Sequence, residues 1–113
     1  MPENILDKII NKKIEKINEL KKIISIKSLE SKIKENKSFV NFKERIENNI
    51  KNDKISIIAE IKKASPSAGI ILDNYDPLNI AQIYNDNKAT CLSVLTEEDF
   101  FLGSLIHISK IKQ

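Results

Sequence analysis

The chain has few of the residues that cross-link a protein, bind metal ions or cross a membrane. Its 113 residues include one cysteine, one histidine and no tryptophan. A single cysteine excludes a disulfide framework and a multi-cysteine metal site, and a single histidine excludes a histidine cluster. No run approaches the roughly 18 to 20 apolar residues of a membrane span. Charges interrupt the apolar positions of residues 1–13, so we expect no secretory signal, no membrane contact and a cytoplasmic location.

Positive charge is plentiful, but it is almost entirely lysine and lies mainly in the first half. Residues 1–54 hold 14 basic and 9 acidic side chains, whereas residues 55–113 hold 5 basic and 7 acidic ones. A nucleic-acid surface usually combines arginine with stacking aromatic residues, but Arg45 is the only arginine and acidic residues are interleaved. We therefore interpret the lysines as solvated helix faces and expect no nucleic-acid partner.

Glycine and proline are scarce, and apart from Pro2 they all lie after residue 64. The first half is therefore expected to be helical. The first helix should have an apolar face made by Ile5, Ile9, Ile10, Ile14 and Ile17. The second should run from Ser28 to about Glu35, with Ser28 or Ser31 as its cap. The third should span residues 39–50 and bury Phe39, Phe42, Ile46 and Ile50.

The second half changes to alternating strands and helices. Residues 55–59 and 90–95 are short apolar runs, which predict strands buried on both faces of a parallel sheet. Between them, Asp76 as N-cap and Pro77 in the first turn predict a helix, and residues 103–104 begin another. Strands joined by single helices indicate right-handed parallel β-α-β units. Two such strands leave open edges, so the sheet is expected to be incomplete.

Glu60 and Lys62 are the first candidates for chemistry. They lie two residues apart at the end of the first predicted strand, so both side chains should point to one face. In α/β folds, sites are built at this end of the strands. The carboxylate of Glu60 would keep Lys62 charged, whereas burial would have the opposite effect. In either case Lys62 is a candidate electrostatic clamp or general acid. The alternative is a solvated ion pair where the strand ends.

The loop after the second predicted strand is the other unusual segment. Two adjacent phenylalanines in an exposed loop need a ligand, a lid or a neighbouring element to cover them. The three acidic residues before them could form a cation site, but no further ligands accompany them and we expect no metal. This loop contains Glu97, Glu98, Asp99, Phe100 and Phe101. Three other residues are interpreted as structural: Cys91, Ser93 and His107.

Three motifs in this order resemble the indole-3-glycerol phosphate synthase family. They are the IAEIKKASPSAG string at residues 58–69, YDP leading into IAxxY at residues 75–84, and LSVLTEEDFFLGSL at residues 92–105. The resemblance implies an α/β fold that is an incomplete (β/α)8 TIM barrel. Residues 1–52 would form a helical extension, and residues 53–113 the first two β/α units.

The resemblance also implies an activity and the residues that serve it. The family converts the phosphorylated substrate 1-(2-carboxyphenylamino)-1-deoxyribulose 5-phosphate to indole-3-glycerol phosphate in tryptophan biosynthesis. This carboxy-lyase reaction releases CO₂ and water and needs no metal or organic cofactor. Lys62 matches a lysine that contacts the substrate carboxylate and takes part in proton transfer, and Glu60 matches a glutamate that orients it. Ser65 matches the first mobile loop, and Phe101 matches the aromatic residue on the anthranilate ring.

Two departures from the family pattern accompany these matches. Lys88–Ala89 replaces the usual Gly-Ala before the second strand, and we expect Asn87 to take the left-handed conformation instead. The family's general-acid lysine on the third strand, its partners and its phosphate-binding loops would follow Gln113. Residues 1–113 alone are therefore expected to be inactive, with a complementary barrel fragment as a possible partner.

Three other interpretations remain open. The basic helices could dock on an acidic partner or RNA as an interaction module. The chain could belong to another phosphate-binding barrel lyase or isomerase. It could also be a non-catalytic half-barrel that dimerises through its open sheet edges.

Overall fold

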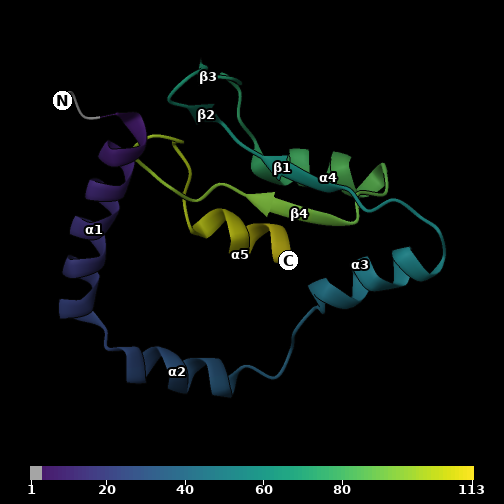
Figure 1. Ribbon diagram of the computed structural model, residues 1–113, viewed down its shortest axis with the longest axis horizontal. Helices are drawn as coiled ribbons and strands as arrows, with labels where there is room; N and C mark the ends of the chain where they lie inside the picture. Colours follow the sequence, from purple (N-terminus) through teal and green to yellow (C-terminus); the bar gives the residue numbers. More distant parts are fainter. Residues whose placement is uncertain (1–3) are drawn as a thin grey trace. The chain divides into compact units, whose positions relative to one another are not determined.

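The computed structural model describes residues 4–113, which form two units divided between Val40 and Asn41. The first unit contains the helices α1 (Ile5–Ile23) and α2 (Ile26–Glu35). The second contains α3 (Phe42–Lys51), the strands β1 (Ile58–Ile61), β2 (Ala64–Ser65), β3 (Gly69–Ile70) and β4 (Cys91–Val94), and the helices α4 (Pro77–Asp86) and α5 (Ile106–Lys112) (Figure 1). Among residues 4–113, no helix is long and apolar enough to cross a membrane.

Side-chain caps set where the first three helices begin. The side chain of Asn4 accepts a hydrogen bond from Asp7 N at 2.8 Å and starts α1. The second helix begins at Ile26 and is capped by Ser25, whose Oγ accepts from Ser28 N at 3.1 Å, so the predicted caps Ser28 and Ser31 are wrong. Ser28 cannot be the cap because it occupies the third helical position, where its own backbone N–H needs an acceptor.

The third helix is shorter and more exposed than its apolar spacing predicts. It begins after Asn41, whose Oδ1 accepts from Glu44 N at 3.0 Å, instead of at Phe39. The predicted burial of its apolar face is also wrong, because Ile46 is only half-buried and Phe39, Phe42 and Ile50 are exposed. Helical periodicity identifies an apolar face but does not say whether another element covers it.

The prediction of a parallel β-α-β unit is confirmed. Strands β1 and β4 pair in parallel, with Ile58 opposite Cys91 and Glu60 opposite Ser93. The intervening helix α4 begins as predicted, with Asp76 accepting from Asn79 N at 3.2 Å and Pro77 in its first turn. Among the described residues this is a two-stranded α/β sheet that does not close.

The first strand lies later in the sequence than predicted and is less buried. The apolar run at residues 55–59 overlaps the hydrogen-bonded strand only at its end, and Ile55 is 88% exposed. Only Ile61 is fully inaccessible, whereas Ile58 is 52% exposed. Parallel strands become buried on both faces when flanking strands and helices surround them, and here each strand has one neighbour. The second strand is confirmed at Cys91–Val94, with Cys91 buried and the rest half-buried.

The segment after β1 folds back on itself, which the sequence did not predict. Strands β2 and β3 pair antiparallel, with Ala64 opposite Ile70 and Ser65 opposite Gly69. Gly69 has φ +66°, a conformation that glycine adopts without a steric cost. The last helix, α5, was predicted to begin at residues 103–104 but begins at Ile106. Leu105 before it provides no side-chain cap.

The turn between α4 and β4 corrects another expectation. Lys88 itself has φ +65°, whereas Asn87 has φ −95°. Asn87 stays on the right-handed side because it caps α4: its backbone N–H and its Nδ2 both donate to Ile83 O, at 3.1 and 2.8 Å. The left-handed position therefore falls on a lysine.

We expect Lys88→Gly to raise the free energy of unfolding of residues 1–113 by about 0.5–1 kcal/mol. A left-handed conformation costs a residue with a Cβ roughly 1–2 kcal/mol, and the extra freedom of glycine in the unfolded chain offsets part of the gain. Denaturant titration measures the change. Asn87→Gly is the matched control and should give no gain, because its φ is already negative. Equal stabilisation by both variants would contradict the explanation.

Candidate active site

The predicted pair Glu60 and Lys62 lies at the carboxyl end of β1. Glu60 is the third residue of the strand and Lys62 follows its last residue. Their side chains lie side by side as their spacing predicts, with Lys62 Nζ 3.5 Å from Glu60 Oε1. The Lys62 side chain is 32% exposed and that of Glu60 is 48% exposed. The pair is thus fixed in geometry while both groups remain accessible to a ligand.

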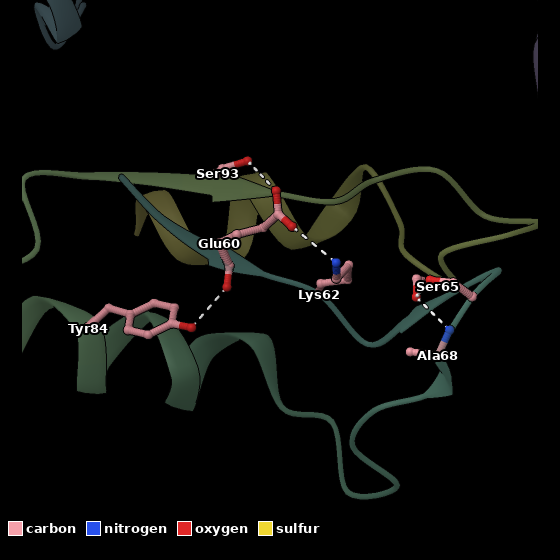
Figure 2. Close-up of polar contacts among 7 residues, drawn as sticks. Glu60, Lys62, Ser65, Ala68, Tyr84 and Ser93 are labelled. Carbon is pink, nitrogen blue, oxygen red and sulfur yellow. Dashed lines mark hydrogen bonds and ion pairs between the residues drawn. The ribbon is translucent and has the colours of Figure 1, made fainter. Parts of the chain in front are cut away.

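Two neighbours hold Glu60 in place, and the sequence analysis identified neither as part of the site. Ser93 Oγ, on β4, donates to Glu60 Oε2 at 3.4 Å. Tyr84 Oη, on α4, donates to the backbone oxygen of Glu60 at 2.9 Å. Figure 2 shows Glu60 between Ser93 and Lys62, with Tyr84 reaching the strand from the helix below. The parallel register places Ser93 directly opposite Glu60, so a correct alignment of the two strands would have found it.

Ser65 occupies a different position from the ion pair. It lies in β2 and is buried, and its Oγ accepts a hydrogen bond from Ala68 N at 3.1 Å. The hydroxyls of Ser65 and Ser67 lie 3.4 Å apart. The hydrogen bonds that the structure gives the Ser65 hydroxyl stay within its own turn (Figure 2), so Ser65 shapes the β2–β3 ribbon.

Phe101 lies in the loop that follows β4 and is half-buried. This loop leaves the sheet at the same end as the segment that carries Lys62, because β1 and β4 are parallel (Figure 1). Glu60, Lys62, Ser65 and Phe101 therefore all belong to segments at the carboxyl end of the sheet. Among these four, the structure joins only Glu60 and Lys62 by a direct polar contact.

An aromatic contact joins the segment just before α4 to α5. The rings of Tyr75 and His107 meet edge-on, with centroids 5.8 Å apart and planes at 62°. His107 thus has a packing partner, although Tyr75 Oη and His107 Nδ1 are buried without a hydrogen bond in the part of the chain that the structure describes. Burial raises the pKa of the Tyr75 hydroxyl, since an apolar surrounding disfavours the phenolate.

We expect Tyr75→Phe to raise the free energy of unfolding by about 1–2 kcal/mol, because it removes a buried hydroxyl that lacks a partner. The parent chain should also lose stability relative to this variant at high pH. The pKa of Tyr75 in the folded chain lies above the ordinary value of 10.0. The free energy of unfolding that this pKa difference contributes is therefore complete below pH 10 and is lost as pH rises through the folded pKa. Urea titrations between pH 8 and 11 measure both effects.

Tyr84→Phe is the matched control for that experiment. Its hydroxyl donates to Glu60 O, so its removal should destabilise the fold by about 0.5–1.5 kcal/mol. A loss of stability in Tyr75→Phe would show that the Tyr75 hydroxyl has a partner and would contradict the prediction.

The acidic loop residues do not gather further metal ligands. Within residues 4–113, no group of three or more histidine, cysteine, aspartate or glutamate side chains is placed to hold a metal ion. Cys91 is buried with a free thiol, as interpreted from the sequence.

Comparison with known proteins identifies relatives along almost the whole chain. The sequence profile of the indole-3-glycerol phosphate synthase family matches residues 6–113. The chain is 43% identical over 109 residues to the indole-3-glycerol phosphate synthase of Desulforamulus reducens, a match that covers 96% of this chain and 40% of that protein. The proteins of the same name from Campylobacter jejuni subsp. jejuni and Clostridium acetobutylicum are 43% identical over 113 residues and 42% identical over 110 residues. These matches cover 96% of this chain and 42% and 40% of the relatives.

The chain therefore spans about 40% of the length of the curated relatives it matches. The profile match includes the β1 segment with Glu60 and Lys62, the β2 segment with Ser65 and the loop with Phe101. On this coverage and identity, the chain belongs to the indole-3-glycerol phosphate synthase family.

Proposed function

We propose that this chain forms the first part of an indole-3-glycerol phosphate synthase. Residues 1–52 are its helical extension and residues 53–113 are the first two β/α units of its (β/α)8 barrel. The observation that carries the proposal is the Glu60–Lys62 pair at the carboxyl end of two parallel strands. In (β/α)8 barrels the active site lies at that end of the strands.

The proposed reaction closes a ring on a phosphorylated aryl-amino sugar. The ring carbon that carries the carboxylate bonds to the ribulose carbonyl carbon, whose oxygen takes a proton. CO₂ then leaves with its bonding electrons returned to the ring. The new hydroxyl takes a proton and departs as water, and the adjacent carbon bonded to nitrogen gives up a proton as the new double bond forms. These steps need an acid near the carbonyl, a cation near the carboxylate and, for the loss of water, both an acid and a base, with no net oxidation.

The roles assigned to the residues are those that the family resemblance implies, and their chemistry is compatible with them. Lys62 binds the substrate carboxylate and takes part in proton transfer, because its ammonium group is accessible and has three N–H donors. Glu60 orients Lys62, and Ser93 and Tyr84 in turn hold Glu60. Ser65 belongs to the loop that covers the substrate, and Phe101 packs on the aryl ring. The proposed chemistry requires no metal or organic cofactor.

Reconstitution with a relative's remaining barrel tests the proposal. Residues 1–113 would be mixed with the part of the Campylobacter jejuni synthase that follows the matched segment, and product formation would be followed by absorbance and fluorescence. We expect no product from residues 1–113 alone and product from the mixture. The exposed apolar residues of β1 and its approach, Ile57 and Ile58, support association with further barrel strands.

Two results would contradict the proposal. Product from residues 1–113 alone would overturn the expectation that the rest of the barrel is needed. A stable complex without product would support the non-catalytic half-barrel instead, as would a discrete dimer of residues 1–113 in sedimentation. Genomic sequencing beyond codon 113 complements the assay, because it shows whether the same frame or a separate one encodes a third strand that carries a lysine.

A further inference from the structure

The loop after β4 is organised around a single carboxylate, that of Glu97. Its Oε1 accepts a hydrogen bond from Asp99 N at 2.8 Å. Its Oε2 accepts from Phe100 N at 2.8 Å and from Phe101 N at 3.0 Å. These three successive backbone N–H groups belong to the segment that carries the Phe101 ring. The position of that ring therefore depends on the Glu97 side chain.

The backbone of Glu97 closes the same loop from its other end. Gly103 N donates to Glu97 O at 2.8 Å. Between them, Leu102 has φ +54°, so the chain turns sharply just after Phe101. Gly103 approaches the backbone of Leu95 so closely that a Cβ there would collide with Leu95 O. Glu97 thus ties together a short loop whose two ends are held against the end of β4.

A carboxylate suits this arrangement because both of its oxygens can only accept hydrogen bonds. Both oxygens of Glu97 act as acceptors, and hydrogen bonds to a charged acceptor are stronger than neutral ones. In Glu97→Gln, one oxygen becomes an NH₂ donor that faces a backbone N–H and cannot accept from it. Glu97 is also one of the three acidic residues that the sequence analysis considered as a cation site. Both of its oxygens already accept hydrogen bonds from the loop backbone.

We propose that Glu97 is a positioning residue that fixes the Phe101 ring for the aryl part of the substrate. This inference rests on the proposed function, because it takes Phe101 as the aromatic residue in contact with the aryl ring. Without the three hydrogen bonds, the loop must be ordered again each time a substrate binds, and that ordering opposes binding. A contact made equally in the ground state and the transition state affects KM more than kcat. Glu97 therefore determines affinity for the aryl group, in contrast to Lys62, which serves the chemical step.

The first test uses residues 1–113 and needs no activity. Amide hydrogen exchange measured by NMR should show the amides of Phe100 and Phe101 protected relative to Leu102, whose N–H has no hydrogen-bond acceptor within residues 4–113. Glu97→Gln should speed exchange at residues 99–101 by at least about 10-fold, since each amide loses a charged acceptor. Glu30→Gln removes an exposed carboxylate on α2 and should change none of these rates. Unchanged exchange at residues 99–101 in Glu97→Gln would overturn the inference.

The second test uses an active enzyme that contains this chain, either as one longer chain or as the reconstituted mixture. Glu97→Gln should raise KM about 10- to 100-fold while kcat stays within a few fold, because the cost of ordering the loop falls on substrate binding. It should add little to Phe101→Leu, since both changes remove the same contact. Additive effects of the two substitutions, or a lowered kcat at unchanged KM, would overturn the inference. If the unsubstituted enzyme does not convert the substrate, the proposed function fails, and the exchange experiment still decides whether Glu97 holds the loop.

Discussion

Lys62→Met should lower kcat about 10²- to 10⁴-fold in an active enzyme that contains this chain. This is the usual effect of removing one group that transfers a proton or stabilises developing charge. Methionine keeps the length and apolar stem of lysine but has no proton to give and no charge. The substitution should leave the fold intact, because a partly exposed ion pair such as Lys62–Glu60 contributes at most about 1 kcal/mol. Steady-state kinetics and a thermal melt of the same preparation measure both effects.

Lys63→Met is the matched control for this prediction. Lys63 is the next residue and should point away from the Lys62 face of the extended chain, and its backbone oxygen accepts from Ile71 N in the ribbon. Its side chain should therefore be dispensable for turnover. The loss of kcat in Glu60→Gln should lie between those of Lys62→Met and Lys63→Met. This substitution removes the charge that orients Lys62 but keeps an oxygen that can accept from Ser93. Equal losses in Lys62→Met and Lys63→Met would indicate a general disturbance of the loop and contradict the assigned role.

Gly103→Ala should lower the free energy of unfolding by about 1–3 kcal/mol, the usual cost of forcing an extra group into a packed position. A Cβ at this position would lie 2.8 Å from Leu95 C and 3.0 Å from Thr96 Cα, and closer still to Leu95 O. These are backbone atoms, so the collision can be relieved only by moving the end of β4 or the loop. The movement would also strain the hydrogen bond from Gly103 N to Glu97 O. Denaturant titration of residues 1–113 measures the loss.

Gly69→Ala separates the steric effect from the conformational one. No atom lies within 4 Å of a Cβ at Gly69, so only its φ of +66° opposes the substitution. We expect a cost of about 1 kcal/mol there, smaller than at Gly103. Amide exchange should locate the two losses in different places, at residues 95–103 for Gly103→Ala and at the β2–β3 ribbon for Gly69→Ala. A larger loss at Gly69 than at Gly103 would contradict the packing argument.

Several features of the site could be predicted without a structure because they depend on local geometry. Residues two apart in a strand share a face, and this alone brings Lys62 beside Glu60. Asp76 and Pro77 start α4 because one accepts from a free N–H and the other tolerates having none. The parallel pairing of β1 and β4 follows from the single helix between them.

Other features could not be predicted because they depend on contacts between distant residues. The sequence marked Ser93 as a packed small residue, and only the register of β1 against β4 makes it a partner of Glu60. The burial expected for Phe42 and Ile50 failed because no described element covers that face of α3. Lys88 took the left-handed conformation because Asn87 was already engaged in capping α4.

The sequence by itself determined the family of this protein, the order of its elements and the two charged groups at the end of its first strand. These depend on residue type, spacing and periodicity, which are properties of the chain alone. Only the tertiary structure decided which partners hold Glu60 and that Glu97 binds three backbone amides next to Phe101. Such hydrogen bonds form only where folding brings a donor and an acceptor within about 3 Å in the right direction, and a linear pattern does not contain that information.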